Sequence, residues 1–327
     1  MAPTTLAGNS TNVRSYSSAR PSRIGALLEL AAIRVRLATA SVFAPQRAAE
    51  IAARLFATPP RHAHTPREQE LLASGVRFDV AVGFKRVVAW RFGPEDRPAI
   101  VASHGWGGRG AQWRAFVPAL LESGYQVVVF DHVGHGHSEG DQSTLVHFID
   151  GIDAIVGDLE RRGVHIAAFL GHSLGAAAVG SWLDRTRRAI PAVLLAPPSS
   201  VIRYSRLFAR RVGISERVRS VMQQTLERRI GRPWTDFELP GSVAHVQSRA
   251  LVIHDADDVE VPFAAGLGVA RAWPGASLVR TRGLGHRLIL RDAQVVRDTL
   301  DFLGGHMVFA PPPAEGARTF DAPAPIA

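Results

Sequence analysis

Ser173 is the residue of this chain best placed to act as a nucleophile, because it lies at the centre of a G-x-S-x-G pentapeptide, residues 171–175. An apolar run precedes the pentapeptide and a run of small residues follows it, which predicts a strand, a sharp turn and a helix. The glycines relieve the crowding that such a turn imposes on the backbone. A turn of this kind lifts the serine hydroxyl out of the sheet, so the pattern predicts catalysis through a covalent intermediate on the serine.

The base that would activate this serine is predicted to be His286. A serine hydroxyl is barely ionised at neutral pH and needs a neighbouring group that accepts its proton. His286 ends the segment G-L-G-H directly after the last predicted strand, where a flexible loop can aim an imidazole. Other histidines have plainer explanations: His165 begins a predicted strand, and His62 and His64 lie in a polar linker.

A carboxylate should orient this histidine and stabilise its protonated form. The loop after the preceding predicted strand offers four acids: Asp255, Asp257, Asp258 and Glu260. Position alone does not choose among them. The chain order serine, acid, histidine is that of hydrolases whose serine lies on a strand–turn–helix elbow.

An anionic tetrahedral intermediate also requires backbone N–H donors. One candidate is the amide of Leu174, which follows the nucleophile at the start of the predicted helix. The second is the amide of Trp106, in the glycine-rich segment 104–108, where glycines let the backbone approach a substrate oxygen. We expect His104 to organise this loop through hydrogen bonds. The candidates for lining the substrate pocket are His104, Gly105, His172 and Met222.

Three histidines, His132, His135 and His137, follow Asp131 closely and raise the question of a metal site. We expect a glycine-punctuated turn whose histidines hydrogen-bond neighbouring loops, because no other adjoining carboxylate has a ligand-like spacing. The chain has no cysteine, which excludes disulfides, a thiolate metal site and a cysteine nucleophile. We therefore predict no metal and no organic cofactor.

The elements that must position these residues alternate between short apolar strands and helical stretches, which is typical of an α/β domain with a parallel sheet. After a hairpin predicted at residues 76–92, strands are predicted at residues 99–103, 126–130, 165–169, 192–196, 250–254 and 277–281. Helices are predicted at residues 112–123, 145–161, 174–185, 263–272 and 292–303. The gap from Pro197 to about Val246 is too long for one crossover and predicts an inserted helical cap.

This organisation divides the chain into five segments. We predict an N-terminal extension at residues 1–65 that begins disordered and becomes helical, with a break near Pro45, and a disordered Pro/Ala-rich tail at residues 309–327. The α/β core occupies residues 66–197 and 246–308, and the cap occupies residues 198–245. Within the cap, residues 215–230 have the spacing of an amphipathic helix, whose apolar side chains either roof the pocket or pack permanently against the core.

The formal net charge of +9 comes almost entirely from arginine, because Lys85 is the only lysine. We find no zinc-finger spacing, no RNA-binding motif and no block of consecutive basic residues, so a nucleic-acid partner is not expected. A solvated basic surface is the interpretation we adopt. The alternative is peripheral contact with an anionic membrane, although for residues 24–56 we favour packing against the rest of the protein.

Five motifs, each at the end of a predicted strand, make the chain resemble the α/β-hydrolase superfamily, in particular its bacterial serine-aminopeptidase-like and monoacylglycerol-lipase-like group. They are H-G-x-G at 104–107, D-x-x-G-H-G-x-S at 131–138, G-H-S-L-G at 171–175, H-x-x-x-D-x-x-V-P at 254–262 and G-H at 285–286. The resemblance implies an α/β-hydrolase fold, a mostly parallel, doubly wound sheet of about eight strands with an inserted helical cap. It also implies a triad of Ser173, His286 and Asp258, because the family's aspartate lies at the fifth position of the fourth motif. The sequence departs from the pattern at Asp255, where the family usually has glycine, and at Asp257.

On this basis we expect a cytoplasmic serine hydrolase that cleaves a small-molecule carboxylic ester through an acyl-enzyme on Ser173. The same site serves lipases, thioesterases, peptidases and acyltransferases, so these activities remain alternatives. An alternative of another class is a non-catalytic, ligand-sensing protein that keeps the fold. The resemblance also implies that a serine at the elbow sets aside the epoxide-hydrolase and haloalkane-dehalogenase branches, which use aspartate there.

Overall fold

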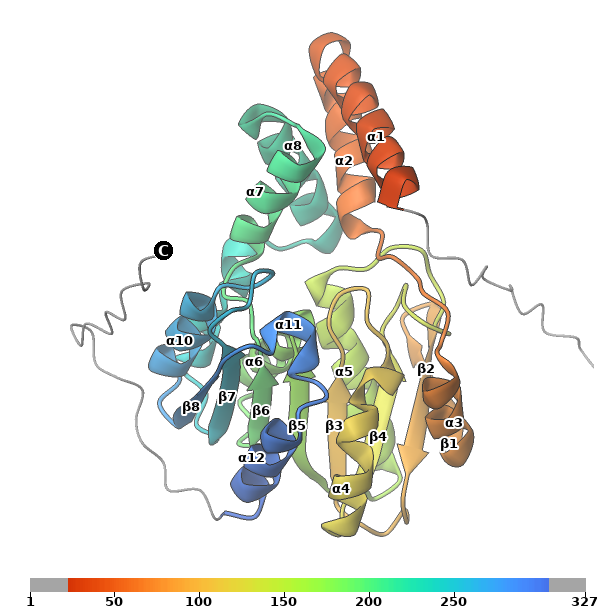
Figure 1. Cartoon of the computed structure of the whole chain (residues 1–327), viewed down its shortest axis with the longest axis vertical. Coiled ribbons are helices and arrows are strands. Elements are labelled where there is room, and N and C mark those ends of the chain that lie inside the picture. Colours follow the sequence, from red (N-terminus) through yellow and green to blue (C-terminus); the bar gives the residue numbers. More distant parts are fainter. Residues whose placement is uncertain (1–22, 306–327) are drawn as a thin grey trace, which may run out of the picture.

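One eight-stranded sheet forms the centre of the computed structural model, which describes residues 23–305 (Figure 1). Its strands are β1 (Val76–Val82), β2 (Lys85–Phe92), β3 (Ala99–Ser103), β4 (Gln126–Asp131), β5 (Ile166–His172), β6 (Ala192–Leu195), β7 (Ala250–Asp255) and β8 (Ala276–Thr281). They lie in the order β1-β2-β4-β3-β5-β6-β7-β8. β2 is antiparallel to β1 and β4, and the other neighbouring pairs are parallel. This mostly parallel sheet confirms the predicted fold class.

The sheet is covered on both faces, which explains the continuous apolar runs of its central strands. Along β3, Ala99 and Val101 belong to one hydrophobic core, and Ile100 and Ala102 belong to another. The alternation follows from the two-residue period of a strand, in which successive side chains point to opposite faces. Because the carboxyl ends of parallel strands share one edge of the sheet, the loops after β3, β5, β7 and β8 meet there.

Helices form the two covering layers. One face carries α5 (Leu145–Arg161), α6 (Leu174–Thr186), α9 (Leu239–Val243) and α10 (Phe263–Ala272). The other face carries α3 (Pro66–Ser74), the 3₁₀ helix η1 (Gly110–Ala115), α4 (Val117–Glu122) and α12 (Ala293–Leu303). A second 3₁₀ helix, η2 (Trp234–Phe237), precedes α9, and the short helix α11 (Gly285–Leu288) follows β8.

Two of the differences from the sequence prediction concern helices that cover the sheet. One helix is predicted over residues 112–123, whereas the structure has η1 and α4 on either side of Phe116. Pro118 lies in the first turn of α4, where a missing N–H is tolerated, so a new helix begins there. Helix α3 is not among the predicted helices. A capping box begins it, in which the side chains of Thr65 and Glu68 each accept a hydrogen bond from the backbone of the other.

Four helices stand away from the sheet and form what we call the helical lobe: α1 (Arg23–Phe43), α2 (Pro45–Ala57), α7 (Val201–Val212) and α8 (Glu216–Ile230) (Figure 1). α1 and α2 come from the N-terminal extension, and α7 and α8 come from the insertion after β6. Pro45 begins α2, where its missing N–H has no partner to lose, so the chain breaks into two helices at the predicted place. The lobe therefore combines two segments that are far apart in the sequence.

Within the lobe, α8 packs mainly against α2. The buried residues of α8 include Val218, Met222 and Leu226. α2 offers a face of small buried side chains, namely Ala48, Ala49, Ala52, Ala53 and Ala57, and small side chains let two helices approach closely. The apolar face of α8 is therefore permanently buried in the hydrophobic core, the second of the two arrangements that the sequence left open, and α2 of the N-terminal extension covers it.

The predicted disorder at the start of residues 1–65 and in the tail at residues 309–327 lies outside the described residues. Among residues 23–305, the structure contains no helix with the length and apolar character needed to cross a bilayer.

Candidate active site

Ser173 occupies the tight turn between the end of β5 and the start of α6. Its backbone has φ 52° and ψ −122°, a strained conformation for a residue with a side chain. A hydrogen bond of 2.9 Å from Ser173 N to Leu195 O ties the turn to β6. Gly175 is required sterically, because a Cβ there would lie 2.4 Å from His104 O. The structure thus has the strand–turn–helix elbow that the pentapeptide predicts.

The loop after β3 passes directly beside Ser173. A Cβ on Gly105 would lie 2.9 Å from Ser173 Cβ, so only glycine fits at that position. Ser173 is 6 % exposed, and its hydroxyl makes no hydrogen bond to the residues that the structure describes. Within residues 23–305, the N–H groups of Trp106 and Leu174 likewise donate to no acceptor. One hydroxyl and two backbone donors are therefore available to a bound substrate.

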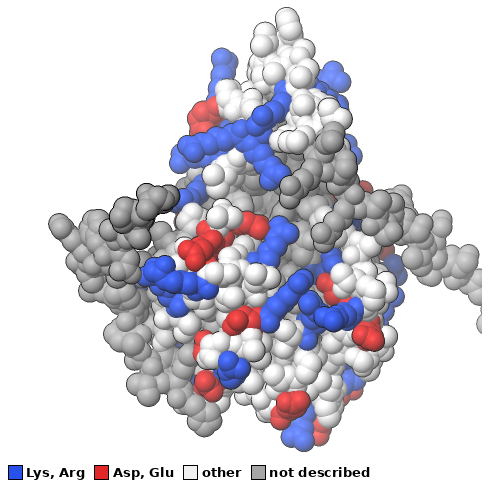
Figure 2. Space-filling model, in the orientation of Figure 1, with Lys and Arg blue, Asp and Glu red and all other residues white. Residues whose placement is uncertain are grey.

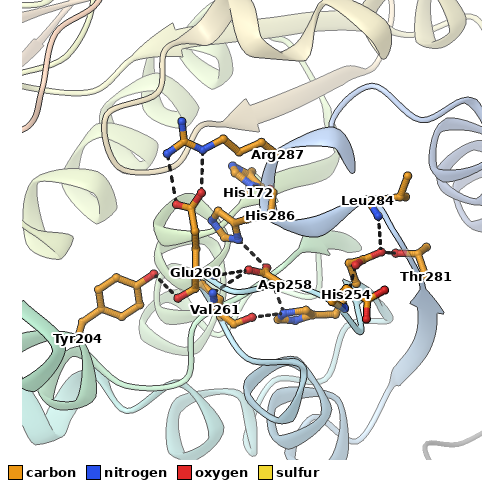
Figure 3. A network of polar contacts seen from close by, with 12 residues as sticks. His172, Tyr204, His254, Asp258, Glu260, Val261, Thr281, Leu284, His286 and Arg287 are labelled. Atoms are coloured by element: carbon orange, nitrogen blue, oxygen red, sulfur yellow. Dashed lines mark hydrogen bonds and ion pairs between the residues drawn. The ribbon is translucent and has the colours of Figure 1, made fainter. Parts of the chain in front are cut away.

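His286, in α11, pairs with the acidic loop after β7 (Figure 3). Its Nδ1 lies 2.7 Å from Asp258 Oδ2, and both side chains are buried. The other oxygen of Asp258 accepts hydrogen bonds from the N–H groups of Glu260 and Val261, each of 2.8 Å. Burial opposes ionisation of Asp258, but hydrogen bonds from His254, His286 and the backbone outweigh it, so the pKa of this carboxyl lies well below its usual value. An ionised carboxylate therefore faces the imidazole.

The other aspartates of this loop hold the segment that carries His286. Asp255 Oδ2 accepts hydrogen bonds from Thr281 Oγ1 at 2.8 Å and from Leu284 N at 3.0 Å. Asp257 Oδ2 accepts one from Gly283 N at 2.9 Å. Burial opposes ionisation of Asp255, but the hydrogen bonds from Thr281 and from backbone N–H groups outweigh it and lower its pKa. Of the four acids that the sequence offers, the structure thus places Asp258 on the histidine.

Two further histidines support this pair. His172, a pocket candidate, donates from Nε2 to His286 O at 2.9 Å, and the two ring centroids are 4.8 Å apart. Burial lowers the pKa of His172 to about 3, so the ring stays neutral. Its Nε2 carries the proton that is donated to His286 O, and its Nδ1 is unprotonated. His254 donates from Nε2 to Val261 O at 2.9 Å and lies 3.5 Å from Asp258 Oδ2. Both histidines are positioning residues that fix the backbone on either side of the pair.

Glu260, beside Asp258, makes contacts that the sequence does not predict, one of them to the helical lobe (Figure 3). Arg287 pairs with Glu260 through Nε–Oε1 at 2.8 Å and Nη2–Oε2 at 3.3 Å. Tyr204, on α7, donates from its hydroxyl to Glu260 O at 3.5 Å. Burial raises the pKa of Tyr204 to about 12, so the phenol remains a donor. No sequence signal marks these partners, because they come from three separate segments with no motif in common.

His104, His132 and His135 form a buried aromatic group with Phe148 beneath the loop after β3. His104 accepts a hydrogen bond at Nε2 from His132 N at 3.0 Å, so its Nδ1 carries the proton and donates to Gly105 O at 2.7 Å. Burial lowers the pKa of His104 to about 4 and that of His135 to about 3, which keeps both rings neutral. His104 therefore holds the loop in place, as its sequence position suggests.

His137, the last histidine of this turn, lies apart from the other two and approaches Asp131 and His64. One ligand atom from each of these three residues lies within 4.8 Å of the others. Asp131, however, already accepts hydrogen bonds from Gly110 N at 2.7 Å and from His137 N at 2.8 Å, one on each oxygen. The carboxylate serves the turn itself, and we assign no metal ion to this group.

Met222 is the one pocket candidate that lies elsewhere. Its side chain is fully buried within the helical lobe, among the residues with which α8 packs against α2. We therefore leave Met222 out of the proposed site.

The chain is similar to several known proteins. Residues 94–256 match a family model described as serine aminopeptidase, S33. A bifunctional esterase/perhydrolase of Acinetobacter calcoaceticus is 35% identical over 96 residues, which are 29% of this chain and 34% of that protein. Epoxide hydrolase A of Mycobacterium tuberculosis is 30% identical over 115 residues, which are 35% of this chain and 33% of that protein. The chain thus aligns with about a third of the length of these relatives.

A solved structure aligns over most of the described chain. Est1E from Butyrivibrio proteoclasticus, in a structure with bound ferulic acid, superposes with a TM-score of 0.58 at 19% identity. The match covers 70% of this chain and 98% of that chain. At this identity the likeness concerns the fold, which the two chains share.

Proposed function

We propose that this chain, a member of the α/β-hydrolase superfamily, is a serine hydrolase that cleaves a carboxylic ester through an acyl-enzyme on Ser173. The observation that carries the proposal is the 2.7 Å pairing of His286 with the buried Asp258 carboxylate. His172, the residue directly before Ser173, contacts the same imidazole, so the pair lies next to the strained serine turn. The ester as substrate is supported by the esterase among the relatives.

In the proposed reaction, His286 accepts the hydroxyl proton of Ser173 as the serine oxygen attacks the ester carbonyl carbon. Asp258 accepts a hydrogen bond from Nδ1–H, which leaves Nε2 as the basic nitrogen and stabilises the imidazolium that forms. The N–H groups of Trp106 and Leu174 donate to the carbonyl oxygen as its negative charge develops. His286 then returns the proton to the departing alcohol, and a water molecule releases the acid from Ser173 by the same steps.

The proposal is tested by covalent labelling of the serine and by measuring the activity of two variants. A fluorophosphonate probe should label the intact protein, and mass spectrometry should find the label on the peptide that contains Ser173. Ser173→Ala and His286→Ala should each lower kcat for a p-nitrophenyl ester by about 10⁴-fold or more, because members of such a triad act as a unit. Ser181→Ala is the matched control, since Ser181 is a second buried serine of α6 and should leave kcat nearly unchanged.

Two results would contradict the proposal. Retention of more than about a tenth of wild-type kcat by folded Ser173→Ala would remove the serine from the mechanism, since loss of the triad costs about 10⁴-fold or more. Absence of labelling and of ester hydrolysis in the folded wild-type protein would instead favour the ligand-sensing alternative.

A further inference from the structure

The positive charge of this protein is concentrated in the helical lobe. Residues 23–57 and 201–230, which form the lobe, carry 13 arginines and 4 glutamates, a net charge of +9. The remaining described residues, 58–200 and 231–305, carry 22 basic and 23 acidic side chains, a net charge of −1. The α/β core is therefore nearly neutral, and the lobe accounts for the charge of the whole molecule.

Most arginines of α7 and α8 are on the surface. Arg219 is the exception, because it is buried and bound to Glu216, Ser205 and Gln223. The exposed ones are Arg203, Arg206, Arg210, Arg211, Arg217, Arg228 and Arg229. Figure 2 shows basic side chains gathered over this part of the molecule, with few acidic ones beside them. Such a field attracts anionic partners.

The turn between α1 and α2 has the opposite character. No residue between Arg36 and Arg47 is charged. Val42 is 75 % exposed and Phe43 is 83 % exposed. This turn forms the far end of the lobe in Figure 1, and that end carries no charged side chain in Figure 2. Neighbouring exposed apolar side chains of this size mark a surface that contacts an apolar partner.

The arginines of the α7–α8 turn lie behind this apolar end. Arg34 of α1 donates from Nε to Arg211 O at 3.0 Å, which places the end of α7 beside the middle of α1. From Arg34 to Phe43, α1 rises by ~13 Å, at about 1.5 Å per residue. The apolar end therefore projects beyond Arg34 and the end of α7 by somewhat more than the depth to which amphipathic segments enter a lipid headgroup layer, about 5–10 Å.

We propose that the helical lobe is a docking surface for a membrane that contains anionic phospholipids. Val42 and Phe43 enter the boundary between headgroups and acyl chains, and the exposed arginines around the α7–α8 turn, Arg210, Arg211 and Arg217, bind the lipid phosphates behind them. A bilayer of anionic lipid has a negative surface and, beneath it, an apolar interior. The lobe matches both layers, because its apolar end projects beyond its arginines. The proposal rests on the lobe alone and is independent of the catalytic assignment.

The test measures binding of the full chain to phospholipid vesicles by co-sedimentation. We expect binding to mixed phosphatidylcholine–phosphatidylglycerol vesicles, weaker binding to phosphatidylcholine vesicles, and a decrease with added salt. The double variant Val42→Ser/Phe43→Ser should lower the partition coefficient by about 10-fold or more, since it removes the apolar contact. Arg210→Gln/Arg211→Gln should lower it by about 10-fold on the anionic vesicles alone. Phe84→Ser is the matched control, because Phe84 is a fully exposed phenylalanine on the β1–β2 turn of the core.

Thermal melting by circular dichroism shows whether each variant is folded. If the folded wild-type chain does not bind anionic vesicles, or if Val42→Ser/Phe43→Ser binds as well as wild type, the proposal is overturned. The apolar end could instead contact a second copy of this chain, and light scattering after gel filtration tests this by measuring the oligomeric state. A wild-type dimer that becomes a monomer in Val42→Ser/Phe43→Ser, with vesicle binding unchanged, would assign the apolar end to contact between copies and overturn the membrane proposal.

Discussion

At the scale of single residues, neighbouring aspartates at the end of β7 and in the loop after it make contacts with different groups. Asp258 meets His286, whereas Asp255 and Asp257 bind the backbone and Thr281 of the segment that carries His286. All are acidic and close in sequence, yet they act on different atoms. Substitution of each by asparagine, which keeps the size and removes the charge, separates the tasks.

We expect Asp258→Asn to lower kcat by about 10²–10⁴-fold with little loss of substrate binding, because an amide N–H facing His286 favours the tautomer in which Nε2 is protonated and cannot accept the serine proton. Asp255→Asn should mainly lower the melting temperature, since it weakens bonds that hold the loop. Asp257→Asn is the control, because that side chain is exposed and makes a single backbone contact. Steady-state kinetics with one ester would check the order, and a larger kcat loss in Asp255→Asn or Asp257→Asn than in Asp258→Asn would refute it.

At the scale of elements, helix α10 shows how packing overrides local preference. Two glycines lie within this helix, Gly266 and Gly268. A Cβ on Gly266 would lie 2.2 Å from His254 Nδ1, whereas a Cβ on Gly268 would meet no atom within 4 Å. The first glycine lets the helix approach the histidine that supports Asp258, and the second has no such role.

Gly268→Ala should therefore raise the free energy of unfolding by about 0.5–1 kcal/mol, because alanine favours a helix over glycine. Gly266→Ala gains the same preference but should lower the free energy of unfolding by about 1–3 kcal/mol, because the methyl group overlaps the His254 ring. Urea denaturation of both variants provides the comparison. Equal shifts in the two midpoints would show that α10 can move away from His254 without cost.

One side chain makes several hydrogen bonds between the N-terminal extension and the core turn after β4. Arg61, between α2 and α3, donates to the carbonyl oxygens of Gly134, Gly136, Ser138 and Gly140. This guanidinium therefore donates to four carbonyl oxygens of a glycine-rich turn. No spacing in the sequence predicts it, because Arg61 is one arginine among many and its four acceptors are backbone atoms.

The sequence predicts features that depend on local patterns, and it does not predict contacts between distant segments. The eight strands and the elbow follow from periodicity and glycine spacing, which are local, and the structure has them within a few residues of the predicted bounds. The acidic loop and His286 follow from their place after β7 and β8. The contact between α2 and α8 does not, because the apolar stripe of α8 identifies a buried face without naming its partner. The spacing therefore cannot tell whether Met222 faces the pocket or, as in the structure, lies buried between helices.

At the scale of the whole molecule, the charge is unevenly distributed. The lobe carries +9 and the rest of the described chain carries −1. The base of the lobe lies at the site, because Tyr204 of α7 binds Glu260 next to Asp258 and Arg287. A field of one sign beside the site should act on charged substrates before they bind.

We expect kcat/KM for an ester that carries a carboxylate to fall as salt rises from low to physiological concentration, since screening shortens the reach of the field to about 8 Å. A neutral ester of equal size should change little. Arg203→Gln/Arg206→Gln, which removes two exposed charges on α7, should flatten the salt profile of the anionic ester. Identical profiles for the two esters in the wild-type protein would remove the lobe charge from substrate capture.

The packing of α8 on α2 also sets the order in which the molecule can be assembled during translation. α2 ends at Ala57 and α8 ends at Ile230, so the ribosome adds roughly 170 residues between them, which takes ~10–35 s at about 5–20 residues per second. Throughout that interval the small-residue face of α2 has no α8 to cover it. α2 is thus among the last elements of the described chain to be buried, although it is made before the strands of the sheet.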